Sequence, residues 1–264
     1  MTATENPVVD LGGGVAMPMV GFGTWQLQGQ MAYEATRHAL QVGYRHIDTA
    51  TMYRNEEQIG RAIADSGLDR ADLFVTTKLP PGNAGRVPAT IAESLKALRT
   101  DYVDLWLVHW PPRSRNLVSL WQDFLAVRDE GLTRSVGVSN YSVRQIDDLI
   151  KADEGGKGGG WGPAVNQIPW SPARYDDALL AAHAERGVAV EGYSPLKGTR
   201  LRDRTLAEIA AKYGVTPAQV VLRWHLDIGV IVIPKASRPE HIEQNFDLFG
   251  FSLTPEEVAR INRL

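Results

Sequence analysis

Short apolar runs rich in β-branched residues alternate along this chain with longer segments whose apolar residues recur at helical spacing. The short runs predict eight strands, near residues 20–24, 46–49, 74–78, 103–109, 135–139, 164–167, 188–192 and 230–233. The longer segments predict helices over 31–41, 56–65, 87–99, 117–129, 143–151, 176–186 and 206–213, with two more over 239–246 and 255–262. Eight strands that alternate with helices are typical of a closed parallel barrel, so we expect an α/β chain with the (β/α)8 TIM-barrel fold.

Glycine-rich segments mark two features of this expected barrel. Gly12 to Gly14 separate two short apolar runs near the N-terminus and predict a β-hairpin before the first barrel strand. The segment 153–162 contains six glycines and is expected to be a flexible loop. Because the alternation of strands and helices continues on both sides of this loop, residues 1–264 are predicted to form a single barrel domain.

Capping residues mark the starts of three helices. Asn55 followed by Gln58 fits a capping box at the start of the second helix. Thr216 and Thr254 each precede a proline, which is favoured at the first helical position. Since the side-chain oxygen of Asn or Thr accepts a hydrogen bond from the first turn, we expect a helix to begin after each of these residues.

Composition narrows the class of protein. Of the 264 residues 44% are apolar and 22% charged, and the net charge is −3. A chain with this net charge has no overall positive charge to attract nucleic acid, so no nucleic-acid partner is expected. The absence of cysteine excludes disulfides, thiol catalysis and zinc–thiolate sites. The N-terminus is polar and the longest apolar run, near 103–110, is too short to span a bilayer, so we expect a soluble, cytoplasmic protein with no membrane partner.

Polar side chains stand at or just past the ends of the predicted strands. Asp48, Lys78 and His109 end three successive strands, and Tyr53 comes five residues after Asp48. Later strands are followed by Asn140, Gln167, Tyr193 and Lys235. Because the active sites of parallel barrels lie at the C-terminal ends of the strands, these side chains are predicted to meet at one mouth of the barrel.

These residue types suit the reduction of a carbonyl group by hydride transfer. The carbonyl oxygen gains negative charge as hydride arrives, so it needs a proton donor and hydrogen-bond donors. Tyr53 can supply the proton if a cation stabilises its phenolate; Lys78 is that cation, and Asp48 pairs with it. His109 can hydrogen-bond the carbonyl oxygen and orient the substrate. Each residue alone also fits a structural ion pair, a packed side chain or a loop cap; their joint occurrence favours a reaction.

Three separated motifs resemble those of one enzyme family. The stretch 43–60 resembles the first signature of the aldo-keto reductases, with four residues in register: Asp48, Tyr53, Glu56 and Gly60. The stretch 134–141 is similar to the second signature, and the stretch from Ile233 to Asn245 is similar to the third. The resemblance covers nearly the whole chain, and it looks most like the short bacterial branch that includes the diketogluconate reductases.

The resemblance implies a catalytic tetrad and a nicotinamide cofactor bound in an extended form across the barrel mouth. The tetrad would be Asp48, Tyr53, Lys78 and His109, with Tyr53 as the general acid. Ser139, Asn140 and Gln167 would form hydrogen bonds with the carboxamide of the cofactor. Tyr193 would stack on the nicotinamide ring, and Ser194, Pro195 and Leu196 would run along the pyrophosphate.

The adenosine end of the cofactor would be held by residues from the third motif, namely Lys235, Ala236, Ser237, Arg238, His241, Gln244 and Asn245. Ala236 stands where the family usually has Ser or Thr, and His241 stands where it usually has arginine. A largely neutral histidine cannot reproduce the fixed donor fork with which arginine holds a phosphate. We therefore expect NADPH as the preferred cofactor, with weaker discrimination against NADH than is usual and with NADH also accepted.

The substrate pocket is predicted to be open. Trp25, Met52 and Trp110 are candidate pocket walls, although each also fits packing at the rim. The family's C-terminal substrate loop is not present after Leu264, so we expect a shallow pocket that accepts varied aldehydes and ketones. A monomer with a small-molecule carbonyl substrate is expected.

Two other functions are compatible with parts of the sequence. A nicotinamide-binding sensor or auxiliary subunit would keep the cofactor site and show only incidental turnover; a complete tetrad argues against that role. A metal-dependent barrel hydrolase would need clustered ligands, and the six histidines include no His-x-His pair at a strand end. We therefore predict no metal site and favour an NAD(P)H-dependent carbonyl reductase.

Overall fold

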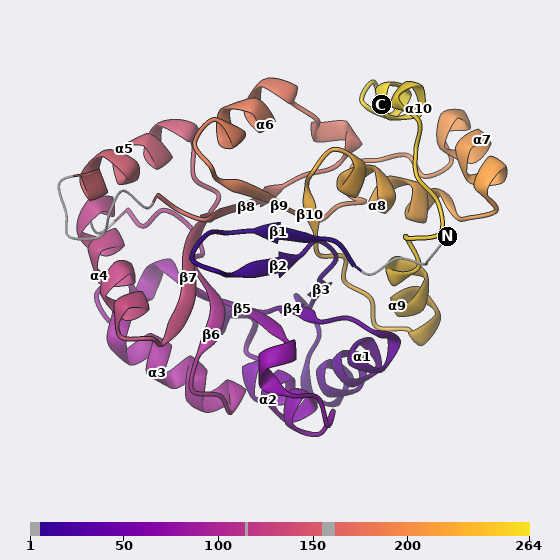
Figure 1. Cartoon of the computed structure of the whole chain (residues 1–264). Coiled ribbons are helices and arrows are strands. Elements are labelled where there is room, and N and C mark those ends of the chain that lie inside the picture. The colour runs from indigo at the N-terminus through magenta and orange to yellow at the C-terminus, as the bar shows by residue number, and fades with distance from the viewer. Residues whose placement is uncertain (1–5, 114–115, 155–161) are drawn as a thin grey trace.

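In residues 6–113, 116–154 and 162–264, which the computed structural model describes, eight parallel strands form the centre of the protein and helices surround them (Figure 1). The strands follow one another around the sheet in chain order. They are β3 (Phe22–Gly23), β4 (His46–Asp48), β5 (Phe74–Leu79), β6 (Val103–Val108), β7 (Thr133–Ser139), β8 (Val165–Pro169), β9 (Ala189–Tyr193) and β10 (Ile231–Val232). Each predicted strand is therefore present, with small differences in its bounds.

Backbone hydrogen bonds close the sheet into a barrel. Val20 forms a parallel bridge with Val232 of β10. The N–H of Gly21 donates to the carbonyl of Val232 at 2.9 Å, and the N–H of Val232 donates to the carbonyl of Met19 at 2.8 Å. The segment predicted as a strand over 20–24 contributes only two residues to β3, because its first part pairs with β10 through this single bridge. The predicted (β/α)8 barrel is confirmed.

The helices cover the outer surface of the barrel. They are α1 (Gly29–Val42), α2 (Glu56–Ala64), α3 (Val87–Leu98), α4 (Leu117–Asp129), α5 (Val143–Glu154), α6 (Asp177–Ala184), α7 (Arg204–Tyr213), α8 (Pro217–Asp227), α9 (Pro239–Phe246) and α10 (Pro255–Ile261). Their apolar faces and the outward side chains of the strands form the main core, which includes Ile47, Trp106 and Phe124. Among the described residues, no helix is both long and apolar enough to cross a membrane.

Close packing between α2 and α3 explains one residue of the first motif. A Cβ on Gly60 would lie 2.5 Å from the carbonyl oxygen of Ala97, so any other residue would push the two helices apart. Gly60 therefore fixes the distance between α2 and α3. The turn that places Tyr53 lies directly before α2, so this packing helps to hold that turn against the barrel.

Two of the three predicted helix caps are confirmed. Thr216 Oγ1 accepts from the N–H of Gln219 at 3.2 Å, and Gln219 Oε1 accepts in return from the N–H of Thr216 at 3.0 Å. Thr254 and Glu257 form the same reciprocal box at the start of α10. Both boxes satisfy backbone N–H groups that have no partner within the first helical turn.

The predicted capping box at Asn55 is wrong. Asn55 is fully buried, and its side chain makes no hydrogen bond to the first turn of α2. Its Nδ2 donates to the carbonyls of Thr24 and Leu27, each at 3.0 Å, and its Oδ1 accepts from Thr49 Oγ1 at 2.8 Å. Burial explains the difference, because buried carbonyls of the loop after β3 need a donor and the Asn55 amide lies against them.

The predicted N-terminal hairpin is confirmed and closes one end of the barrel. β1 (Val8–Asp10) and β2 (Ala16–Pro18) pair antiparallel, and in Figure 1 they lie across the end of the barrel. Met17 is fully buried in a cluster that also contains Leu105, Val165 and Ile231 from barrel strands. The hairpin therefore covers the end of the barrel opposite to the one where the strands finish. Residues 155–161 of the predicted glycine-rich loop lie outside the described residues.

Candidate active site

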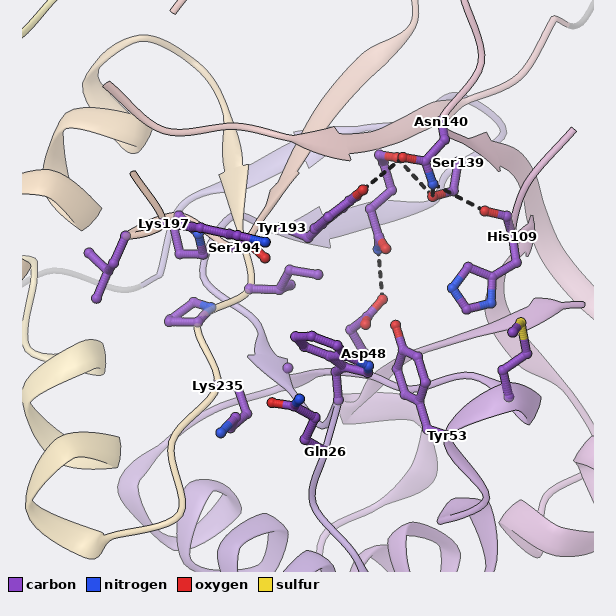
Figure 2. Close-up of a pocket in the computed structure, with 18 of the residues that line it drawn as sticks. Gln26, Asp48, Tyr53, His109, Ser139, Asn140, Tyr193, Ser194, Lys197 and Lys235 are labelled. Carbon is purple, nitrogen blue, oxygen red and sulfur yellow. Dashed lines mark hydrogen bonds between the residues drawn. The ribbon is translucent and has the colours of Figure 1, made fainter. Parts of the chain in front are cut away.

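A cavity of about 550 Å³ opens at the carboxyl ends of the barrel strands (Figure 2). Parallel strands all finish at the same end of a barrel, so side chains from distant parts of the sequence converge there. Most of the predicted site residues line this cavity: Trp25, Asp48, Met52, Tyr53, His109, Trp110, Ser139, Asn140, Gln167, Tyr193, Ser194, Pro195, Leu196 and Lys235. The structure therefore brings the predicted strand-end residues together.

Lys78 lies beneath the cavity and connects two of its lining residues. Its Nζ donates to both carboxylate oxygens of Asp48, each at 2.7 Å, and to the carbonyl of Thr49 at 2.7 Å. The same ammonium donates to the phenol oxygen of Tyr53 at 3.4 Å and lies 5.0 Å from the centre of the Tyr53 ring. Lys78 and Asp48 are at most 1% exposed. A fully buried ion pair thus contacts the phenol directly.

Burial and the neighbouring charges set the ionisation of this group. Burial alone would lower the pKa of Lys78, but attraction by Asp48 and Tyr53 outweighs it, and the pKa of Lys78 is raised. Burial also raises the pKa of Tyr53, and the charge of Lys78 opposes that increase. Tyr53 therefore carries its proton at neutral pH, next to a cation that stabilises the phenolate left when the proton is given up.

His109 lies at the edge of the Tyr53 ring, with the ring centres 5.6 Å apart. Its Nδ1 is buried and has no hydrogen-bond partner among the described residues. Burial, assisted by the charge of Lys78, lowers the pKa of His109 to about 3, so the imidazole is neutral. A buried N–H group without a partner is rarer in proteins than a buried acceptor without one. We therefore place the proton on Nε2.

The turn after β4 fixes the position of Tyr53. This single 3-10 turn, η1 (Thr51–Tyr53), is joined to β5 because Thr51 Oγ1 donates to the carbonyl of Lys78 at 3.0 Å. Gln28 Nε2 donates to the carbonyl of Tyr53 at 2.8 Å from the other side. Arg54 has a left-handed φ of 55°, which turns the chain sharply into α2. The turn that carries the phenol is therefore held by hydrogen bonds between side chains and backbone carbonyls, to two neighbouring segments.

A row of hydrogen bonds runs along the ends of β7, β8 and β9 beside the cavity (Figure 2). Tyr193 Oη donates to Asn140 Oδ1 at 2.8 Å, and Asn140 Nδ2 donates to Ser139 Oγ at 2.9 Å. Ser139 Oγ donates to the carbonyl of Gln167 at 2.8 Å. Asn140 has a left-handed φ of 63°, a conformation that asparagine tolerates better than most residues. These bonds fix the directions of the polar side chains on this wall.

Of the residues predicted to hold the adenosine end, only Lys235 lines the cavity. The others follow it along the chain into α9: Ala236, Ser237, Arg238, His241, Gln244 and Asn245. Ala236 and Asn245 are buried and the remaining four are exposed. The guanidinium of Arg238 donates to the imidazole of His241, so the two side chains share one surface beside the cavity.

The three predicted substrate residues form an exposed apolar rim around the mouth. Trp25 and Met52 are each 53% exposed and Trp110 is 47% exposed, and all three line the cavity. Large apolar side chains left open to solvent around a cavity are typical of a ligand site. This rim suits contact with the apolar part of a small molecule.

Some lining residues were not predicted from the sequence, among them Gln26 and Lys197. Lys197 directly follows the stretch from Ser194 to Leu196 that is predicted to run along the pyrophosphate, and a basic residue at the end of that stretch indicates a further phosphate contact. Glu191, which lies beneath the cavity, was also missed. Its position inside an otherwise apolar strand was the clue, because a fully buried carboxyl group needs specific partners.

The cavity offers different chemistry at its two ends. Amide and hydroxyl groups and the ring of Tyr193 lie at the inner end, whereas Lys197 and Lys235 lie on the lining without an ion-pair partner among the described residues. This arrangement suits an elongated ligand that carries negative charge away from its reacting end. No cluster of three or more His, Asp or Glu side chains arranged to hold a metal ion occurs in the described residues.

Comparisons with known proteins agree with this geometry. The model of the aldo/keto reductase family matches residues 19–264. The chain is 43% identical over 264 residues to an aldo-keto reductase of Mycolicibacterium smegmatis, covering 98% of this chain and 94% of that protein. It is 40% identical over 265 residues to methylglyoxal reductase DkgA of Escherichia coli, again covering 98% of this chain and 94% of that protein.

A solved structure leads to the same conclusion. The crystal structure of a Bombyx mori aldo-keto reductase in complex with NADP is 36% identical to this chain, with a TM-score of 0.90, and the match covers 99% of this chain and 93% of that one. The family resemblance seen in the three sequence motifs is therefore confirmed. The chain belongs to the aldo/keto reductase family, whose members are oxidoreductases of carbonyl compounds.

Proposed function

We propose that this chain reduces aldehydes and ketones to alcohols with a nicotinamide cofactor, and that Tyr53 gives the proton to the carbonyl oxygen. The observation that carries the proposal is the contact between Lys78 and Tyr53, in which an ammonium lies 3.4 Å from a phenol oxygen at the inner end of the cavity. A phenol gives up its proton more readily when a cation stabilises the phenolate.

The other two residues of the proposed tetrad act through their contacts. Asp48 accepts two hydrogen bonds from Lys78, and this pairing keeps the ammonium charged and aimed at Tyr53. His109 presents a neutral Nε2–H toward the cavity, where it donates to the carbonyl oxygen. Donors that are fixed in place before the reaction stabilise the charge that develops on that oxygen without reorganising.

The residues around the cavity fit a nicotinamide dinucleotide, which when bound supplies the hydride. Tyr193 offers an aromatic face for the nicotinamide ring. Gln167 uses its Nε2 for Asp48 and Glu191, so its Oε1 is the atom that can accept from a carboxamide, beside Ser139 and Asn140. The ammonium groups of Lys197 and Lys235 suit the phosphates. A volume of about 550 Å³ lies within the range of small-ligand sites.

We propose NADPH as the preferred cofactor, with NADH also accepted. Lys235, Ser237 and Arg238 are exposed next to the cavity and can receive a 2′-phosphate. His241 contacts Arg238 and does not offer the planar fork of donors with which an arginine holds a phosphate. Discrimination against NADH should therefore be weaker than an arginine at residue 241 would give.

We propose small aldehydes and ketones as the substrates. The exposed rim of Trp25, Met52 and Trp110 leaves the mouth open, which favours broad acceptance over tight binding. Methylglyoxal is a rational first substrate to test, because the Escherichia coli relative is named a methylglyoxal reductase. A set that also contains aromatic aldehydes and simple ketones would show which part of the rim is used.

The alternative function is a nicotinamide-binding sensor. A sensor needs the residues that bind the cofactor, but it does not need a proton donor. The hydrogen-bonded group of Asp48, Lys78 and Tyr53 favours turnover instead. The test is to mix the chain with NADPH and each carbonyl compound and to follow the loss of NADPH absorbance. We expect sustained turnover that is unchanged by a metal chelator. A single burst followed by no turnover, with NADPH still bound, would support the sensor instead.

A further inference from the structure

Glu191 is a fully buried carboxyl group inside the barrel that the proposed reaction does not use. It lies on β9, in register with Gln167 of β8. Gln167 Nε2 donates to Glu191 Oε2 at 2.8 Å and to Asp48 Oδ2 at 2.8 Å, so one amide connects two carboxyl groups. The ammonium of Lys78 directs its hydrogen bonds to Asp48, Thr49 and Tyr53, and no cationic side chain among the described residues contacts Glu191 Oε2.

The other oxygen of Glu191 faces His46. Glu191 Oε1 lies 3.5 Å from His46 Nε2 and has no other partner among the described residues. His46 Nδ1 contacts the carbonyl of Pro18 at 3.1 Å, and because a carbonyl only accepts, Nδ1 carries a proton. A Cβ on Gly21 would collide with the His46 ring, so glycine at this residue is what allows the imidazole to lie here.

His46 Nε2 lies 3.5 Å from Glu191 Oε1 and 3.5 Å from the hydroxyl Oγ1 of Thr76, and the contact with Glu191 needs one further proton. A neutral imidazole protonated at Nδ1 has a lone pair at Nε2, and a carboxylate oxygen facing it would place two acceptors together. The proton belongs either to Glu191, which gives a neutral pair, or to His46, which gives an ion pair. Both side chains are 0% exposed, and the cost of burying two charges favours a neutral hydrogen bond over an ion pair.

Electrostatics agree with the neutral pair. Burial, followed by the charge of Asp48, raises the pKa of Glu191 to about 8. Burial lowers the pKa of His46 to about 4, although Asp48 opposes this shift. Both directions leave the proton on Glu191 at neutral pH.

We propose that Glu191 is a positioning residue that works as a neutral carboxylic acid, donating from Oε1 to His46 and accepting from Gln167 at Oε2. In this state it holds the Gln167 amide against Asp48 and leaves Asp48 as the counter-charge of Lys78. Loss of the proton places a second negative charge near the tetrad. That charge makes Tyr53 a weaker acid and slows carbonyl reduction, a consequence that rests on the proposed function.

The titratable groups that face Glu191 inside the barrel come from β4, β5 and η1, and they are His46, Asp48, Lys78 and Tyr53. The histidines on the outer side of β8 and β9 have other partners. His183 contacts Asn166 at 2.9 Å, and His225 contacts the carbonyl of Trp170 at 3.4 Å. The protonation of Glu191 is therefore set by the inner group alone.

Infrared spectroscopy of Glu191→Gln tests the protonation without any need for turnover. An amide accepts and donates as the protonated acid does, so this variant should fold. We expect the wild-type-minus-variant spectrum at about pH 7 to contain the C=O band of a protonated carboxylic acid, and the band to disappear as the pH rises through about 8. The matched control is Glu56→Gln. Glu56 is another buried acid, which accepts from Thr77 at 2.6 Å, and this substitution should leave the Glu191 band in place.

The pH profile of reduction tests the positioning role. In the wild type, kcat/KM should fall as the pH rises through about 8. In Glu191→Gln the midpoint should move up by about one pH unit or more, toward the titration of Tyr53. Glu191→Leu cannot accept a hydrogen bond from Gln167, and its kcat/KM should be about tenfold below the wild-type value. Glu191→Gln should retain most of the wild-type kcat/KM.

The outcomes separate this inference from the proposed function. Absence of the carboxylic acid band at about pH 7 would overturn the neutral-acid state in favour of an ion pair with His46. An unchanged alkaline midpoint in Glu191→Gln would overturn the positioning role. If the wild type reduces no carbonyl compound, the proposed function fails, while the infrared result still decides the state of Glu191.

Discussion

Lys78 donates to both carboxylate oxygens of Asp48, each at 2.7 Å, and the two residues are at most 1% exposed. At so buried a pair, the loss of one partner leaves the other charge poorly solvated. The pair therefore links stability to the proposed chemistry, because the cation that assists Tyr53 is itself held by Asp48.

Removing the negative charge of this pair should destabilise the fold. Asp48→Asn leaves the Lys78 ammonium buried without its counter-charge, and we expect a loss of about 3–5 kcal/mol in the free energy of unfolding. Urea denaturation measures this loss. The double variant Asp48→Asn with Lys78→Met removes both charges and should recover part of the stability. Equal stability of the single and double variants would contradict the buried-charge argument.

Reduction should not change with pH between about 5 and 7. An ordinary histidine gains a proton below about pH 6.5, but burial and Lys78 hold the pKa of His109 near 3, so His109 stays neutral over this range. Tyr53 keeps its proton over the same range because its pKa is raised. The measurement is kcat/KM for a ketone that does not itself ionise. A change in kcat/KM with a midpoint near pH 6.5, present in the wild type and absent in His109→Gln, would contradict the neutral imidazole.

Asn55 should matter for stability more than a helix cap does. Asn55→Ala leaves the buried carbonyl of Leu27 without a donor, and the carbonyl of Thr24 keeps only the N–H of Leu27. We expect a loss of about 3 kcal/mol in the free energy of unfolding. Asn116→Ala is the matched control. Asn116 is an exposed cap that accepts from the N–H of Ser119, so its loss should cost about 1 kcal/mol. If both variants lose a similar amount of unfolding free energy, Asn55 contributes no more than a helix cap, which would contradict this prediction.

An arginine at residue 241 should increase the preference for NADPH. His241→Arg adds a permanent charge and a planar donor fork beside Arg238, and we expect the ratio of kcat/KM with NADPH to that with NADH to rise by about tenfold. The KM for the carbonyl substrate should stay unchanged, since His241 does not line the cavity. A wild-type preference of many thousandfold for NADPH, or no response to the substitution, would contradict weak discrimination.

The barrel and the gathering of polar residues at its mouth could be predicted from the sequence, for a physical reason. Asp48, Lys78 and His109 each follow an apolar run, and parallel strands bring such ends to one place. The precise partners could not be predicted. Asn55 with Gln58 has the spacing of a capping box, and only the buried carbonyls of Thr24 and Leu27 show that the side chain turns elsewhere.

Glu191 shows the same limit inside a strand. Barrel strands are buried on both faces, so the alternation of apolar and polar residues that would reveal the direction of a side chain is absent. The pattern of 188–192 therefore predicts a strand without showing that Glu191 faces inward. Its contacts with Gln167 and His46 depend on the register of β8 with β9 and on the space left by Gly21.

The most direct test of the proposed reaction is Tyr53→Phe. Phenylalanine keeps the ring beside His109 and removes only the proton donor. We predict that kcat for carbonyl reduction falls by about a thousandfold, a typical contribution of general acid catalysis, while the Kd for NADPH changes by less than about twofold. Retention of most of the reductase activity in this variant would contradict the assignment of Tyr53 as the general acid.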